Sequence, residues 1–247
     1  MLPTAGEVGR GVIVEDLSDI AESCPPEVQR FDALEGISGV RHSLLLKAPR
    51  IDVSLDRQDA IANLRPYYRG GISCLGYTFE QTATAEQVHG SNIARVDCVQ
   101  GFDFPVAGVD GLVTDRPGIL LGILVADCCA VYMTDRQGRA IALVHSGRKG
   151  AQLGIVSAAI REMIKLGIEA ENLVVQLSPC IRPPAYEEDF AAIIRRDCMR
   201  AGIPADQIHD EGICTSSNPG RYYSYRGEGG KTGRMLALLG LSHIPEV

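Results

Sequence analysis

Three side chains with metal-binding or nucleophilic chemistry stand where the apolar pattern of the chain breaks. Cys128 follows Asp127 directly after an apolar run, and His145 ends a second apolar run just before glycines. His89 precedes Gly90 in a polar stretch. Thiolate and imidazole bind zinc and copper, and the same groups serve as nucleophile and base in hydrolases. These positions are therefore the candidate reactive residues.

Two chemistries fit this set of residues. In the first, Cys128 is a thiolate nucleophile, His145 is its base, and His89 or Asp127 orients the base. In the second, His89, Cys128 and His145 are the protein ligands of a metal ion whose fourth position holds water, as in catalytic zinc sites. Residue types and spacing leave both open, beside a third interpretation in which the residues belong to an inert core.

A β-hairpin is the element expected to bring Cys128 to His145. Residues 130–133 are apolar enough for a buried strand, residues 135–138 supply turn chemistry, and residues 140–144 form the next strand. The second arm of such a hairpin returns to the end where the first arm began. The pattern therefore predicts that Cys128 and His145 meet there, and that the glycines after His145 leave room for an anionic ligand.

Strands and helices alternate along the rest of the chain. Strands are expected over residues 42–47, 92–99, 119–125, 172–177 and 212–215, and helices over residues 58–68, 153–164, 190–199 and 234–241. Hairpins mixed with strand-to-helix passages favour an α+β fold with mixed sheets over a purely parallel one. Residues 227–232 resemble a P-loop without its first glycine, so they are expected to be the loop that starts the last helix.

Length and charge restrict the class of protein. The 247 residues carry a net charge of −7 with Lys and Arg scattered, so no nucleic-acid or membrane-surface contact is expected. No secretory signal or membrane span is recognisable, which predicts a cytoplasmic location. Eight cysteines without a C-x-x-C pair are expected to be reduced thiols. The partners expected are small molecules, with the chain a monomer or a weak homo-oligomer.

The domain organisation is expected to be simple. Residues 1–40 are interpreted as an N-terminal extension of unclear structure, packed on a single domain of residues 41–247, with a short strand over residues 11–14. The histidines outside the candidate set are expected to have structural or solvent-exposed positions; they are His42, His209 and His243.

Six groups of short motifs occur in order between about residues 40 and 240. They are Gln87-Val88-His89-Gly90; Asp110-Gly111-Leu112-Val113-Thr114; Ala126-Asp127-Cys128; His145-Ser146-Gly147 with Gly150; Ser178-Pro179-Cys180-Ile181; and Tyr223-Ser224-Tyr225-Arg226 with Thr232-Gly233-Arg234-Met235. In this order they resemble the motifs of the YfiH/laccase-domain family, also called the multicopper polyphenol oxidase or purine nucleoside phosphorylase family.

The resemblance implies a cytoplasmic, single-domain protein with a layered α/β/β/α fold and two mixed sheets. It implies a zinc ion, or else copper, on the positions that match the family's ligands, His89, Cys128 and His145. It also implies cleavage of adenosine or inosine by phosphate, giving base and ribose 1-phosphate, or deamination of adenosine. Asp127 would be a proton donor to the purine or an anchor beside the ligand. Lys149 and Arg226 are the candidate contacts to the anionic substrate.

The chain departs from the family pattern after the third ligand. The family sequence His-Ala-Gly-Trp-Arg-Gly is His145-Ser146-Gly147-Arg148-Lys149-Gly150 here, so Arg148 replaces a tryptophan and Lys149 an arginine. The proline that usually follows Asp-Cys is Ala130. Lysine cannot make the bidentate contact of arginine. These departures motivate a non-catalytic nucleoside-binding sensor as an alternative. Two further functions stay open: a metal-independent Cys–His hydrolase or amidase, and a copper-dependent polyphenol oxidase.

Overall fold

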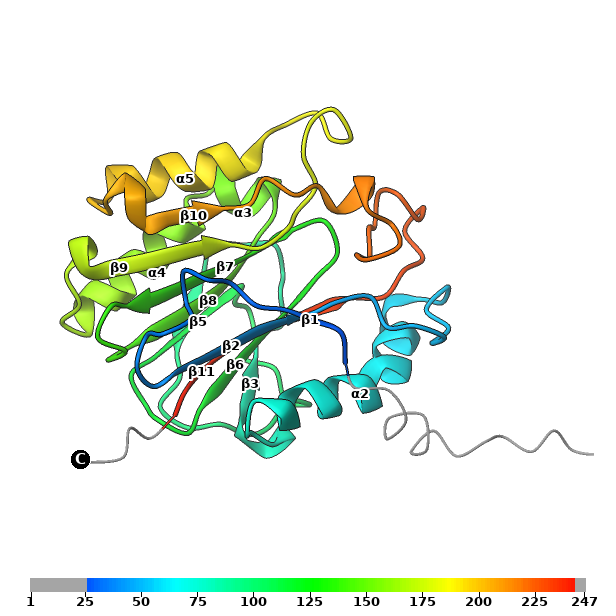
Figure 1. Ribbon diagram of the computed structural model, residues 1–247, viewed down its shortest axis with the longest axis horizontal. Helices are drawn as coiled ribbons and strands as arrows, with labels where there is room; N and C mark the ends of the chain where they lie inside the picture. Colours follow the sequence, from blue (N-terminus) through cyan, green and yellow to red (C-terminus); the bar gives the residue numbers. More distant parts are fainter. Residues whose placement is uncertain (1–25, 243–247) are drawn as a thin grey trace, which may run out of the picture.

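Two mixed β-sheets lie at the centre of the computed structural model, which describes residues 26–242 (Figure 1). The first sheet has the order β1 (Val28–Gln29), β2 (Val40–Leu45), β11 (Met235–Leu241), β6 (Leu120–Val125) and β3 (Thr82–Thr84). The second has the order β10 (Ile208–Asp210), β9 (Leu173–Leu177), β7 (Cys129–Asp135), β8 (Ile141–Ser146), β5 (Gly111–Thr114) and β4 (Ile93–Arg95). Each contains parallel and antiparallel pairs, which confirms the predicted fold class.

Strand β7 shows why its sequence is apolar without interruption. Ala130 and Tyr132 point into the core shared with the first sheet, whereas Cys129, Val131 and Met133 belong to a second core beneath the helices. Successive side chains of a strand face opposite sides, so a strand covered on both faces must be apolar at every position. The two sheets therefore stack directly on one another.

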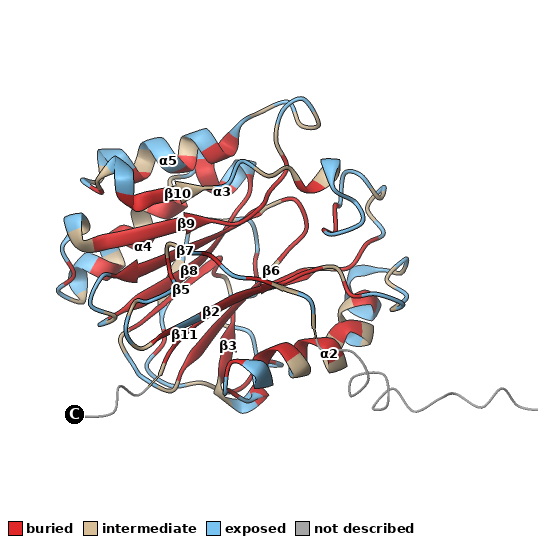
Figure 2. Cartoon of the chain, viewed as in Figure 1, coloured by how far each residue is buried: buried red, intermediate tan, exposed pale blue. Residues whose placement is uncertain are grey.

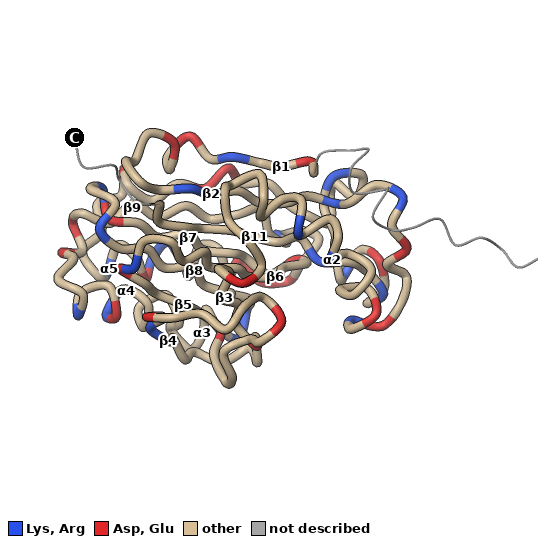
Figure 3. Tube along the Cα trace, turned by 90° about the horizontal axis from the view of Figure 1, so that it is seen from below, with Lys and Arg blue, Asp and Glu red and all other residues tan. Residues whose placement is uncertain are grey.

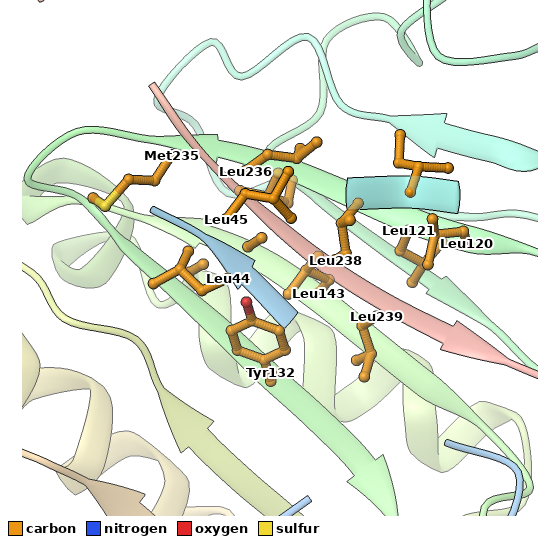
Figure 4. Packing of buried hydrophobic residues seen from close by; sticks show 14 of the residues in the cluster. Leu44, Leu45, Leu120, Leu121, Tyr132, Leu143, Met235, Leu236, Leu238 and Leu239 are labelled. Carbon is orange, nitrogen blue, oxygen red and sulfur yellow. The ribbon is translucent and has the colours of Figure 1, made fainter. Parts of the chain in front are cut away.

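Figure 4 shows part of the core between the sheets, where leucines from both sheets lie near Tyr132. Tyr132 is fully buried, and its hydroxyl donates a hydrogen bond to the Ser43 carbonyl oxygen of β2, 2.9 Å away. A buried phenol that lacked an acceptor would destabilise the fold, so this bond fixes how β7 lies across β2.

Helices cover the two sheets. Helix α2 (Arg57–Cys74) packs against the first sheet, while α3 (Arg148–Gln152), α4 (Ile155–Lys165) and α5 (Phe190–Arg200) cover the second. Each long helix is buried on the side facing the sheets and exposed on the other (Figure 2). No helix of residues 26–242 combines the length and the apolar character that crossing a membrane requires. Acidic and basic residues are interspersed along the trace (Figure 3).

Most of the predicted strands are present in the structure, although their ends differ from the prediction. The predicted strands over 42–47, 119–125, 130–133, 140–144 and 172–177 correspond to β2, β6, β7, β8 and β9, and the 92–99 strand shortens to β4. The described part of the extension, from residue 26, supplies β1 and buries Phe31 and Leu34 in the first core. Residues 11–14 lie outside the described part of the chain. The described cysteines are free thiols.

The predicted helix over 234–241 was wrong, because these residues form β11. In a short, continuous apolar run, hydrophobic periodicity cannot distinguish a strand from a buried helix. Here the run pairs with both β2 and β6 and is therefore a strand. The loop over 227–232 therefore precedes a strand and starts no helix. Residues 212–215 form only an isolated bridge, Cys180 with Cys214, where a strand was expected.

Three helix predictions need correction. Helix α2 continues past the predicted end at residue 68, through Gly70 and Gly71, to Cys74. A β-carbon at Gly71 would lie 2.2 Å from the Leu45 Cδ2 atom, so the glycine allows close packing on β2. Helix α4 begins only after Gly154, whose φ of 73° breaks the helix, so Leu153 is exposed. Two further residues of the predicted apolar faces, Ile164 and Met199, are also exposed.

A buried histidine predicts how stability depends on pH. The Nε2 atom of His42 accepts a hydrogen bond from the Phe31 N–H, 2.9 Å away, and burial together with Arg30 lowers the pKa of His42 to about 4. The unfolded chain takes up this proton near pH 6.5. Stability contributed by His42 is therefore complete above pH 6.5 and is lost as the pH falls to 4, by about 3 kcal/mol.

The variant His42→Gln keeps an acceptor for the Phe31 N–H but cannot take up the proton. We expect its free energy of unfolding to fall less between pH 7 and pH 4.5 than that of the wild type. Urea unfolding at both pH values measures the free energy of unfolding. An equal loss of this free energy between pH 7 and pH 4.5 in the two proteins would contradict the assignment to His42.

Candidate metal centre

The structure brings the three candidate ligands together. The ligand atoms of His89, Cys128 and His145 all lie within 4.8 Å of one another, and no other His, Cys, Asp and Glu cluster of this kind occurs in residues 26–242. The two imidazole rings stand nearly perpendicular, with centroids 4.9 Å apart. In the β7–β8 hairpin, Ala130 is opposite His145, which places Cys128 beside the histidine. This arrangement can hold one metal ion.

The ligands lie where the chain passes between sheets. His89 lies in the connection from β3 in the first sheet to β4 in the second, and Cys128 lies in the connection from β6 to β7. His145 is the last residue but one of β8. The polar break after the apolar run of β6 therefore marks the point where the chain leaves one sheet for the other.

The backbone around two ligands is strained. His89, Gln87 and Asp127 have positive φ values of 58°, 63° and 82°, a region that residues other than glycine seldom occupy. The Gln87 side chain holds its segment against β6, because its amide donates to the Leu124 carbonyl oxygen and its oxygen accepts the Leu124 N–H. Strained residues of this kind cluster at functional sites, where the surrounding contacts enforce the conformation.

Asp110 orients two of the ligands. Its buried carboxylate accepts hydrogen bonds from the backbone N–H groups of His89 and Gly90, at 2.8 and 2.7 Å, and lies 2.9 Å from the His145 Nδ1 atom. A proton on Nδ1 leaves Nε2 of His145 free to bind a metal ion. The sequence showed Asp110 only as part of a family motif, because nothing in its neighbours indicates which backbone groups it will meet.

The neighbouring groups shift the pKa values of Cys128 and His145 in opposite directions. Burial by itself raises the pKa of Cys128, but hydrogen bonds from His145 and His89 bring that pKa down to about 6. Burial lowers the pKa of His145, yet Asp110 and Cys128 raise it to about 9. Cys128 is therefore a thiolate at neutral pH, the form that binds metals, and His145 must release a proton when a metal binds.

Asp127 anchors the segment that carries Cys128. Its Oδ1 atom accepts a hydrogen bond from the Thr215 hydroxyl and its Oδ2 atom one from the Arg226 N–H, both at 2.7 Å. Its carbonyl oxygen accepts the Ile181 N–H at 2.8 Å. The carboxylate thus joins two other segments to the one that carries Cys128, and the carbonyl oxygen joins a third, which favours the anchoring role over proton donation.

Gly147 leaves room for the thiol of Cys128. A β-carbon at Gly147 would lie 2.6 Å from the Cys128 Sγ atom, closer than any real contact of this type. The space that the sequence suggested for an anionic ligand at this glycine is therefore filled by the cysteine ligand itself.

Adding a methyl group at Gly147 is expected to displace the thiol. We predict that Gly147→Ala weakens zinc binding by roughly tenfold or more, comparable with the loss of a group that orients a ligand. Competition with a chromophoric chelator measures the affinity. Gly220→Ala is the control, because nothing lies within 4 Å of a β-carbon there. Equal affinity in both variants would show that Cys128 does not depend on this space.

The cluster opens into a cavity of about 700 Å³ lined by arginines and aromatic rings. Arg226, a sequence candidate, lines this cavity, whereas Lys149 does not and its neighbour Arg148 does. The remaining cationic and aromatic lining residues are Arg57, Arg234, Tyr186, Phe190 and Tyr225. Arg57 and Arg234 were missed as site residues, since only the tertiary fold brings the start of α2 to the segment before β11.

Arg57 and Arg234 lack a carboxylate partner. Within the described chain neither guanidinium forms an ion pair, and Arg234 donates only to the backbone oxygens of Thr232 and Gly233 at 2.9 Å. Burial and the repulsion from Arg57 lower the pKa of Arg234, while Tyr68 and the Cys128 thiolate oppose the shift. Two neighbouring cations without a counter-ion favour an anionic ligand between them.

Comparison of the sequence with models of protein families identifies the family to which the chain belongs. The model described as multi-copper polyphenol oxidoreductase laccase matches residues 47–189 and 186–242. The chain belongs to the laccase-domain family. The resemblance read from the ordered motifs is thereby confirmed.

Relatives in the laccase-domain family carry the name purine nucleoside phosphorylase. YlmD of Geobacillus stearothermophilus is 28% identical over 227 residues, which span 77% of this chain and 81% of YlmD. A purine nucleoside phosphorylase of Mycobacterium bovis is 30% identical over 191 residues, spanning 68% of this chain and 75% of the relative.

Solved structures of the family share the fold. The crystal structure of YlmD from Geobacillus stearothermophilus has a TM-score of 0.75 at 25% identity and covers 89% of this chain and all of YlmD. The Bacillus licheniformis hypothetical protein YfiH has a TM-score of 0.74 at 23% identity, covering 89% of this chain and 98% of that protein. The single-domain architecture with two mixed sheets is thus that of the laccase-domain family.

Proposed function

We propose that this chain is a zinc-dependent purine nucleoside phosphorylase. The observation that carries the proposal is the His89–Cys128–His145 cluster. It opens into a cavity lined by Arg57 and Arg234, which have no carboxylate partner within the described chain. The names of its relatives support nucleoside and phosphate as substrates.

The donor set fits a zinc ion. His89, Cys128 and His145 would hold it, and a thiolate with two imidazoles matches the ligands of catalytic zinc sites. The same donors also suit copper, but the described residues offer a single cluster, which favours one ion over a multicopper centre. When bound, the ion supplies a positive charge that polarises a ligand oxygen.

The residues of the chain divide the remaining tasks. Arg57 and Arg234 bind inorganic phosphate, and the rings of Tyr186, Phe190 and Tyr225 provide apolar surface for the purine. In phosphorolysis a phosphate oxygen bonds to C1′ of the ribose while the C1′–N9 bond breaks, and the leaving base takes up a proton. Holding the anion in place supplies the orientation that this displacement requires.

Chromatography of adenosine incubated with the purified, zinc-loaded protein tests the proposal. Adenine and ribose 1-phosphate are expected only when phosphate is present. Inosine formed without phosphate would replace phosphorolysis by deamination. Absence of any product would remove adenosine as a substrate, and oxidation of a phenol by copper-loaded protein would then favour the polyphenol oxidase. Binding of adenosine without turnover would favour the sensor.

Loss of the Arg234 guanidinium is expected to weaken phosphate binding. Arg234→Gln should raise the KM for phosphate by about tenfold to a hundredfold, the equivalent of the ~1.5–3 kcal/mol of a hydrogen bond to a charged group. Steady-state rates at varied phosphate measure it. Arg161→Gln, an exposed position on α4 outside the cavity, is the control. Equal KM values in the two variants would exclude Arg234 from the phosphate site.

A further inference from the structure

A second pair of cavity arginines is joined by an acidic side chain. Arg148 comes from α3 and Arg226 from the segment that precedes β11, and both line the cavity. Glu187, in the loop between β9 and α5, accepts hydrogen bonds from both. Arg148 Nη1 lies 3.2 Å from Glu187 Oε1, and Arg226 Nη2 lies 3.3 Å from Glu187 Oε2. We call Arg148 and Arg226 the bridged pair.

Glu187 neutralises the bridged pair incompletely and binds it weakly. One carboxylate serves two guanidiniums, so one positive charge is left over. Both distances exceed the 2.7–2.9 Å that is typical of a charged N–H···O bond. All three side chains are about half exposed, and ion pairs in water contribute little to stability. The carboxylate can therefore be displaced at small cost by a group with more charge.

Arg226 has contacts besides Glu187. Its guanidinium lies over the ring of Tyr186, 5.0 Å from the centroid, and Tyr186 packs edge-on against Phe190. The Arg226 N–H is held by Asp127. A preformed cation of this kind loses little conformational entropy when it binds an anion.

We infer that the bridged pair binds a phosphate group of the substrate itself, in place of Glu187, so that the substrates are purine nucleoside 5′-phosphates. The inference rests on the proposed function, in which Arg57 and Arg234 hold the attacking phosphate. A phosphate monoester offers three oxygens and nearly two charges, which match two guanidiniums better than one carboxylate does. The 700 Å³ cavity lies in the upper part of the range of ligand sites, roughly 300–1,000 Å³.

Calorimetric titration of the full, zinc-loaded protein with adenosine 5′-monophosphate (AMP) and with adenosine tests the inference, in buffer free of phosphate. AMP is expected to bind at least roughly tenfold more tightly than adenosine. Arg148→Gln and Arg226→Gln should each remove most of this difference in affinity between AMP and adenosine.

Glu187 provides the sharper comparison. Glu187→Gln removes the competing carboxylate and should tighten AMP binding several-fold without changing adenosine binding. Glu188→Gln removes the same charge one residue further along, where the side chain accepts hydrogen bonds from Gln152 and not from the bridged pair, and should leave the affinity for AMP unchanged.

The outcomes separate this inference from the proposed function. AMP that binds no more tightly than adenosine overturns the inference, and phosphorolysis of adenosine would still support the phosphorylase. An AMP preference that is lost in Arg57→Gln but kept in Arg148→Gln also overturns it, because the substrate phosphate would then lie between Arg57 and Arg234. An AMP preference through the bridged pair without any phosphorolysis supports the ligand class and overturns the phosphorylase.

Discussion

Replacing Cys128 by alanine is expected to abolish zinc binding and to lower kcat/KM for phosphorolysis by roughly a thousandfold or more. The thiolate is the charged member of the ligand set, and a catalytic metal contributes several kcal/mol of transition-state stabilisation, of which each 1.36 kcal/mol corresponds to tenfold in rate. The zinc content by atomic emission and the release of adenine measure the two effects in the same preparation.

The adjacent cysteine is the matched control. Cys129 is fully buried on the opposite side of β7, in the core beneath the helices, and its thiol lies near Ser178. Cys129→Ala is expected to keep both zinc and activity while losing about 1–2 kcal/mol of stability. Metal-free wild-type protein that still turned over its substrate, and lost activity only on alkylation of Cys128, would instead support the cysteine hydrolase.

Replacing Asp110 by asparagine is expected to weaken zinc binding by about tenfold to a hundredfold. The carboxylate accepts from two backbone N–H groups and faces the Nδ1 atom of His145. An amide has one oxygen for these donors and presents its own NH₂ group to the rest, so His89 and His145 both lose their orientation. Competition with a chromophoric chelator gives the affinity, and the pKa of His145 by NMR should fall as well.

Asp115, directly after β5, serves as the control for this change, whereas Asp110 directly precedes β5. Asp115 is partly exposed and pairs with Arg95 at 3.3 Å, outside the cavity. Asp115→Asn removes the same charge and should leave zinc affinity unchanged. Wild-type affinity in Asp110→Asn with reduced thermal stability would mean that Asp110 only stabilises the loop and does not position the ligands.

The reactive side chains could be predicted because their chemistry is rare in this sequence. The chain has only five histidines, and position beside a glycine or at the end of an apolar run picks out His89, Cys128 and His145 as candidates; the hairpin turn at residues 135–138 explains how two of them meet. Both features are local in the sequence: a thiol directly after a predicted strand, and a turn short enough to join two strands into a hairpin.

The rest of the site depends on contacts that no local pattern records. Asp110 is an ordinary carboxylate until the fold places two backbone N–H groups and an imidazole around it. Arg57 and Arg234 stand 177 positions apart in the chain and meet only across the cavity. Strand β11 was mistaken for a helix for the same reason, because its partners β2 and β6 are remote in sequence.

The two connections between the sheets have a consequence for the lifetime of the protein. His89 and Cys128 each lie on a passage from one sheet to the other, and His145 belongs to the second sheet. An ion bound to all three must be released before the sheets can separate there, so it suppresses partial opening of the fold. Proteases cleave opened segments, so we expect the metal-free chain to be degraded faster than the metal-loaded one.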